Sequence, residues 1–109
     1  MNTANLQLEG VYAAIAALMD ALRAKNLLSE VEIDEALTKA EHCLAKDPAR
    51  PAELSAANLD AICFPLRLLR VANARGARGE DCSFTCLAAE VGRTKPGQPR
   101  NAVRADLPA

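Results

Sequence analysis

The sequence predicts a small all-α protein, and its composition and periodicity support that fold class. Half of the 109 residues are apolar, but Trp, Tyr and Phe together number three, so strand formation has little to draw on. Apolar residues recur instead at the three- and four-residue steps of an amphipathic helix along four segments. A chain of this length fits one domain with one modest core. We therefore expect a bundle of about four helices, and we expect it to be dimeric.

The first predicted helix runs from about Asn5 to Lys25. One face of it carries five regularly spaced apolar residues, Leu8, Val11, Ile15, Leu18 and Leu22. The stretch from Gly10 to Met19 has no charge, and the rest of its circumference is mostly Ala, so it needs cover on more than one side. A homodimer is the simplest way to supply that cover. The predicted interface residues are Val11, Tyr12, Ile15, Ala16, Leu18, Met19 and Leu22.

The second predicted helix follows a break at Lys25 and Asn26 and begins at a capping box formed by Ser29 and Glu32. Acids crowd its first turns and bases come later, which complements the helix dipole. Prolines between residues 47 and 51 end it. Its predicted buried stripe is Ile33, Leu37, Ala40 and Leu44. The acid pairs Glu32 with Glu35 and Asp34 with Glu41 are assigned to solvent, and helices one and two are expected to form an antiparallel hairpin.

The third predicted helix runs from Ser55 to about Ala74 and is interrupted by Pro65. Proline deletes one backbone hydrogen bond and collides with the preceding turn, so the helix is expected to kink or restart near Phe64 and Pro65. Its apolar face is formed by Leu59, Ile62, Leu66 and Leu69.

A short fourth helix is predicted from Ser83, as its N-cap, to Val91, with Gly92 as its stop. Its apolar face is formed by Phe84, Leu87, Ala88 and Val91. The expected organisation is one helical domain over residues 1–92, followed by a basic tail over residues 93–109 that is flexible or ordered by a partner.

The charge of the chain is divided along its length. Residues 1–64 carry ten acids and five bases, whereas residues 65–109 carry eight bases and four acids. A partner is a better explanation of such asymmetry than a reaction, because summed charge governs association. Four arginines after Pro65 are the candidate contacts for an acidic protein or a polyanion: Arg67, Arg70, Arg75 and Arg78.

The cysteines are expected to be reduced thiols in a cytoplasmic protein. The uncharged run of the first helix follows Glu9 and no base, which is the wrong polarity for a signal peptide, and it is too short to span a bilayer. Cys43 and Cys63 are assigned to the core. Cys86 is the candidate reactive thiol, because at the third position of the fourth helix the positive end of the helix dipole would lower its pKa.

Two further interpretations receive less support from the residues. His42 and Cys43 are adjacent on a helix and point about 100° apart, so with Cys82 and Cys86 they make a poor zinc set, and no metal is expected. Residues 88–92 resemble the end of the first helix and the turn of a helix-turn-helix motif. Two prolines and a glycine then stand where the motif requires a recognition helix.

These observations predict a non-enzymatic oligomerisation or partner-binding protein. A regulatory or polyanion-binding module, using the arginines after Pro65, is the alternative for which nucleic acid is a possible ligand. A thiol-dependent activity or redox sensing at Cys86 is the third interpretation.

Overall fold

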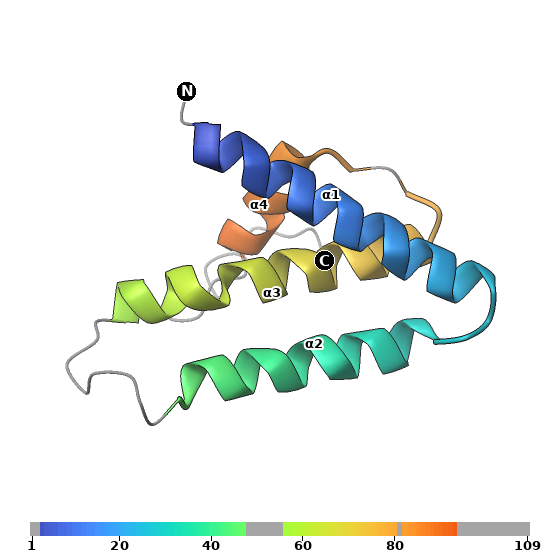
Figure 1. Ribbon diagram of the computed structural model, residues 1–109, viewed down its shortest axis with the longest axis horizontal. Helices are drawn as coiled ribbons and strands as arrows, with labels where there is room; N and C mark the ends of the chain where they lie inside the picture. The colour runs from blue at the N-terminus through green and yellow to red at the C-terminus, as the bar shows by residue number, and fades with distance from the viewer. Residues whose placement is uncertain (1–2, 48–55, 81, 94–109) are drawn as a thin grey trace, which may run out of the picture.

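The computed structural model describes residues 3–47, 56–80 and 82–93 of the chain. These residues form four helices and contain no strand: α1 (Thr3–Ala24), α2 (Glu30–Ala45), α3 (Ala56–Ala77) and α4 (Phe84–Arg93). α2 and α3 run antiparallel side by side, α1 crosses over α3, and α4 packs on a further side of α3 (Figure 1). The predicted all-α class is confirmed. The proposed tail lies outside the described residues, except for Arg93.

Local sequence signals set the ends of the helices as predicted. The amide of Glu32 donates to Ser29 Oγ at 3.1 Å, and the amide of Ser29 donates to Glu32 Oε1 at 2.8 Å, which completes the capping box of α2. Asn26 adopts a φ of 58° and ends α1, a left-handed conformation that Asn tolerates. Gly79 has a φ of 73° and ends α3 in the same way.

Pro65 lies inside α3, which is assigned as one uninterrupted helix from Ala56 to Ala77. The predicted restart is therefore wrong, whereas the predicted kink stays a prediction. A proline removes one hydrogen bond of the helix ladder. α3 compensates through burial, because Cys63 and Leu69 retain 5% or less of their surface and Leu68 retains none.

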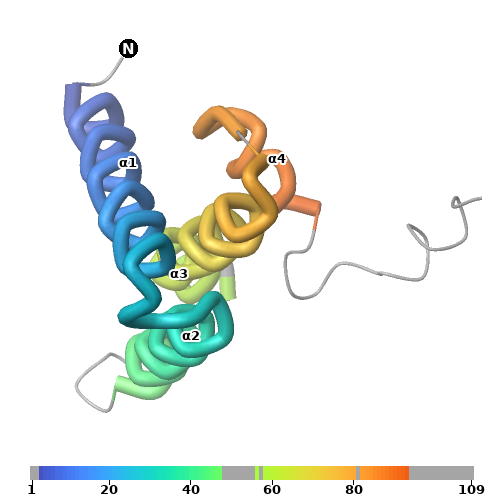
Figure 2. Tube along the Cα trace, turned by 90° about the vertical axis from the view of Figure 1, so that its right-hand side faces the viewer, coloured from blue at the N-terminus to red at the C-terminus, as the bar shows by residue number. Residues whose placement is uncertain are grey.

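The core consists of two clusters that share α3. The first is centred on Met19, Ile33 and Leu69, where α1 and α2 meet α3 close to the turn that joins them. The second is centred on Leu68, Leu87 and Val91 and holds α4 against α3. α3 thus lies between the other three helices (Figure 2). α1 and α2, which were predicted to form a hairpin, pack less extensively against each other than α2 packs against α3.

The buried face of α2 differs in part from the predicted stripe. Ile33 is buried and Leu37 and Leu44 are half-buried, as expected, but Ala40 is exposed. Glu41 is half-buried in its place. The partly buried face of α2 thus includes Glu41, whose carboxylate accepts a hydrogen bond from Arg67 of α3.

One buried polar residue joins three helices. Asn73 of α3 is 1% exposed, and its side-chain amide donates to the carbonyl oxygen of Glu30 at 3.0 Å. Its Oδ1 accepts a hydrogen bond from Arg23 of α1, which is also bonded to Asp20. Beside this network the backbone of Gly76 meets Arg23 and Asp20 so closely that a Cβ there would collide with both side chains.

Candidate functional site: the exposed seam of α1

α1 carries an apolar seam that the rest of the chain covers only in part. We call Leu8, Val11, Ile15, Leu18 and Leu22 the α1 seam. Their alternating three- and four-residue steps are those of the a and d positions of a coiled coil. Leu8 is 51% exposed, Val11 50% and Leu18 65%, while Ile15 and Leu22 are half-buried. Leu8, Val11 and Leu18 are therefore available to a further helix, whereas Ile15 and Leu22 already pack against the core cluster of Met19, Ile33 and Leu69.

The surroundings of the seam suit close packing of a helix. Ala14 and Ala21 are exposed and follow the seam on its open side, at the heptad position next to a. No charge occurs between Gly10 and Met19. The seam extends over roughly 21 Å, at about 1.5 Å of helix rise per residue. A second helix could approach it without desolvating an ionic group.

The structure divides the predicted interface residues into three groups. Val11 and Leu18 are exposed, so they remain candidates. Ile15, Leu22, Tyr12 and Ala16 are half-buried and all pack against the core cluster of Met19, Ile33 and Leu69, and of these Ile15 and Leu22 belong to the seam. Met19 is 5% exposed and packs with Ile33 and Leu69, so the single chain already covers it.

Sequence reasoning also left out exposed apolar residues at the start of α1. Leu6 is 49% exposed and was not predicted as a contact, and Leu8 was placed on the apolar face but not in the interface. The heptad spacing from Leu8 to Leu22 was the signal that could have included Leu8.

A groove separates α1 from α4, and Leu8 at the start of the seam also lines it. Three adjoining cavities of about 380, 330 and 130 Å³ form it. We call it the α1–α4 groove. Its walls and floor include Tyr12, Ala13, Ala17, Leu68, Cys82 and Phe84. In Figure 2, α1 and α4 stand on either side of α3.

The aromatic pair Tyr12 and Phe84 crosses this groove near its middle. The two ring centroids lie 5.5 Å apart and the ring planes differ by 22°, which is a stacked arrangement. Burial raises the pKa of the Tyr12 phenol, because an apolar setting disfavours the phenolate. The pair connects α1 to α4 across the groove.

Two of the candidate arginines pair with acids of α2. Arg67 Nε donates to Glu41 Oε2 at 2.9 Å, and Arg70 Nε donates to Asp34 Oδ1 at the same distance. The hydrogen bond to Asp34 raises the pKa of Arg70. Asp34 and Glu41 are half-buried, so their predicted assignment to solvent is wrong. The prediction missed that α3 presents arginines to this face.

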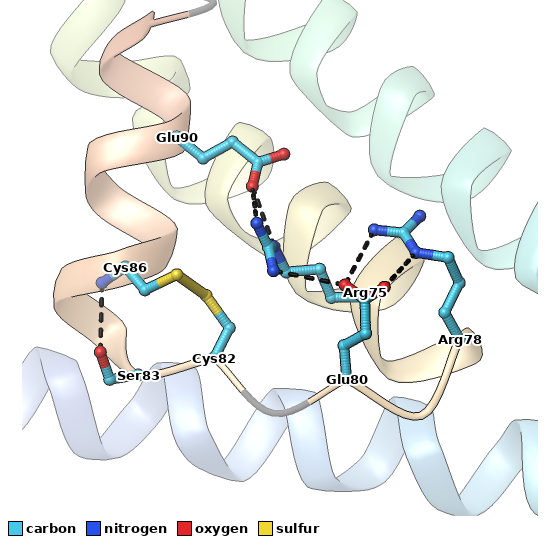
Figure 3. A network of polar contacts seen from close by, with 7 residues as sticks. All are labelled: Arg75, Arg78, Glu80, Cys82, Ser83, Cys86 and Glu90. Atoms are coloured by element: carbon cyan, nitrogen blue, oxygen red, sulfur yellow. Dashed lines mark hydrogen bonds and ion pairs between the residues drawn. A yellow bond between two sulfur atoms is a disulfide. The ribbon is translucent and has the colours of Figure 1, made fainter.

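The other two arginines pair with acids near α4 (Figure 3). Arg75 Nη2 donates to Glu90 Oε1 at 2.7 Å, and Arg75 Nη1 donates to Glu80 Oε1 at 3.3 Å. Arg78 Nε donates to Glu80 Oε2 at 3.0 Å, and this bond lowers the pKa of Glu80. All four candidate arginines are therefore paired with carboxylates of their own chain.

The cysteines differ from the expectation in two respects. Cys82 and Cys86 form a disulfide with a Cα separation of 5.7 Å, so the expectation of reduced thiols is wrong for this pair. Cys43 is exposed and not in the core, because it lies on α2 away from α3, whereas Cys63 is buried as predicted. The reactivity of Cys86 stays a prediction for the reduced chain.

The described residues give no support to the metal-binding or helix-turn-helix hypotheses. Among the described residues, no group of three or more His, Cys, Asp and Glu side chains is placed to hold a metal ion. Residues 88–92 all lie in α4, and the residues after Arg93 are outside the described part. None of the four described helices is long and apolar enough to cross a membrane.

Comparison with known proteins adds no relative. No family model, curated protein or solved structure matches this chain.

Proposed function

We propose that this protein is a non-enzymatic oligomerisation module that pairs with a second copy through the α1 seam. The observation that carries the proposal is the exposure of Leu8, Val11 and Leu18, half or more each, at heptad positions of a helix. Full burial of one such side chain contributes about 1.5–3 kcal/mol, so covering several of them can stabilise a dimer.

A second copy is the partner that this seam fits best. Two identical seams are self-complementary about a twofold axis, so each leucine meets the same kind of surface that it presents. The uncharged flanks, with Ala14 and Ala21, create no repulsion between copies and permit close approach. Because Arg67 and Arg70 already pair with Glu41 and Asp34, little charge remains in this region to select an acidic partner.

Charge substitutions in the seam test the proposal by solution mass. Leu18→Glu places a carboxylate in the seam at an exposed position, which spares the core of the single chain. Ala13→Glu is the matched control, because it adds the same charge to the same helix but on the groove side. We expect light scattering at micromolar concentration to give dimers for the wild type and Ala13→Glu and monomers for Leu18→Glu. A wild-type monomer, or a Leu18→Glu dimer, would contradict the proposal.

A further inference from the structure

The Cys82–Cys86 disulfide lies at the N-terminus of α4 (Figure 3). Ser83 is the cap of this helix: its Oγ accepts a hydrogen bond from the amide of Cys86 at 3.2 Å, and its carbonyl accepts the amide of Leu87 at 2.9 Å. Cys82 therefore precedes the cap, and Cys86 is the third residue of a helix of ten residues.

The two sulfur atoms lie in different electrostatic and steric environments. The first-turn amides and the positive end of the α4 dipole favour negative charge on Cys86, which lies inside the first turn. Cys82 lies outside the helix, half-buried, and lines two of the three cavities of the α1–α4 groove. A thiol that enters the groove can thus reach Cys82, and Cys86 is the better leaving group.

We propose that Cys82 and Cys86 are a reversible dithiol–disulfide couple that exchanges with low-molecular-weight or protein thiols, with Cys86 as the thiolate that leaves and re-forms the bond. This inference goes beyond oligomerisation and does not depend on it.

The exchange proceeds in two balanced steps. An incoming thiolate attacks Sγ of Cys82, the bond between the two protein sulfurs breaks, and Cys86 leaves as a thiolate that takes up a proton. A second thiol then attacks the sulfur of the incoming group in the mixed disulfide and releases Cys82, which also takes up a proton. Two external thiols are oxidised to one disulfide, and two electrons pass to the protein.

α4 has other attachments that hold it in both redox states. Leu87 and Val91 are buried against Leu68, and Glu90 is bonded to Arg75. The Ser83 cap does not involve either sulfur atom. Reduction therefore requires no unfolding of the helix, and its effect is confined to the wall of the groove around Cys82.

Redox titration of the full chain tests the couple. The Cys43→Ser variant removes the exposed cysteine, and Cys63 is buried. The protein is equilibrated with mixtures of reduced and oxidised glutathione, its free thiols are trapped by alkylation, and the alkylated thiols are counted by mass spectrometry. We expect two thiols to appear or disappear together while the far-ultraviolet circular dichroism stays unchanged. Tyr12 is the one tyrosine of a chain without tryptophan, so its fluorescence should change with the couple. The proposal would be overturned if the disulfide were reduced only in denaturant, or if Cys82 and Cys86 failed to form a disulfide at any ratio of oxidised to reduced glutathione.

Single-cysteine variants test the assigned roles. In the Cys43→Ser background, Cys82→Ser leaves Cys86, and Cys86→Ser leaves Cys82. At neutral pH we expect the Cys86 thiol to react with oxidised glutathione about threefold to tenfold faster than the Cys82 thiol. Both variants should retain the helical circular dichroism of the parent. Equal rates, or a faster Cys82, would overturn the role given to Cys86.

Discussion

Asn73 donates a hydrogen bond from its side-chain amide to the main-chain oxygen of Glu30, 3.0 Å away. The bond connects the second half of α3 to the first turn of α2, and Arg23 of α1 completes the link by donating to Asn73 Oδ1. One buried amide thus fixes the relative position of three helices, which is the scaffold that holds the α1 seam in place.

Replacing Asn73 should destabilise the whole bundle. Asn73→Ala leaves the Glu30 carbonyl and the Arg23 guanidinium without this partner, and we expect the free energy of unfolding to fall by about 1–3 kcal/mol. Urea denaturation followed by circular dichroism measures the change. Lys39→Ala, at an exposed position of α2, is the control and should change stability little. An Asn73→Ala variant as stable as the wild type would show that the network contributes nothing.

The ion pair of Arg67 and Glu41 should be energetically coupled. Both side chains are 18% exposed, so solvent screens them less than it screens a surface pair. A double-mutant cycle with alanine at both positions should give a coupling free energy of about 1–2 kcal/mol. Arg78 and Glu80 are 55% and 45% exposed and serve as the matched control with a smaller coupling. Equal coupling in the two pairs would contradict the importance of burial.

Ionisation of Tyr12 should lower the free energy of unfolding as the pH rises into the alkaline range. Its pKa is raised above 10.0 in the folded chain by burial. The stabilisation is therefore complete below the unfolded pKa and is lost as the pH rises through the folded pKa. Phenolate absorbance should show a higher midpoint in the folded than in the urea-unfolded chain, and Phe84→Ala should lower the folded midpoint. Identical midpoints in the two states would refute the prediction.

The paired arginines should contribute little to polyanion binding. Arg67 and Arg70 are both bonded to carboxylates of α2, so a phosphate or sulfate group would have to displace an existing partner. We expect retention on heparin to be the same for the wild type and for the Arg67→Ala, Arg70→Ala double variant. A marked, salt-dependent loss of retention in the double variant would instead support the polyanion-binding alternative.

Local sequence signals predicted the elements of this fold well. The capping box of Ser29 and Glu32, the Ser83 cap and the break at Asn26 each depend on a few neighbouring residues, and the structure has all three. The apolar periodicity also predicted four helices close to the positions at which the structure has them. Such signals suffice because helix ends are satisfied by groups that lie close in the sequence.

The relative placement of the helices was beyond these signals. Periodicity shows that a helix has an apolar face, but not how many neighbours it has, so the central position of α3 and the complete burial of Leu68 were missed. The same limit explains why Ala40 and Cys43 were placed in the core. The burial of Asn73 could not be predicted from the sequence pattern, because a buried amide is identified only by its hydrogen-bond partners in the fold.

The candidate site was predicted in part. The uncharged stretch from Gly10 to Met19 is a property of the sequence, and Val11 and Leu18, which were assigned to the interface because of it, are exposed in the single chain. Met19 could not be separated from them, because its side of the helix becomes buried only through the approach of Ile33 and Leu69. The pairing of Cys82 with Cys86 was missed because all the cysteines were expected to be reduced thiols.

Intermolecular nuclear Overhauser effects test the central claim most directly. In a mixture of isotope-labelled and unlabelled chains, filtered spectra record only contacts between copies. We predict that methyl groups of Val11 and Leu18 show such contacts with methyl groups of the α1 seam, and that Ala13 on the groove side shows none. Absence of intermolecular contacts at a protein concentration well above the micromolar range, or contacts confined to the α1–α4 groove, would contradict pairing through the α1 seam.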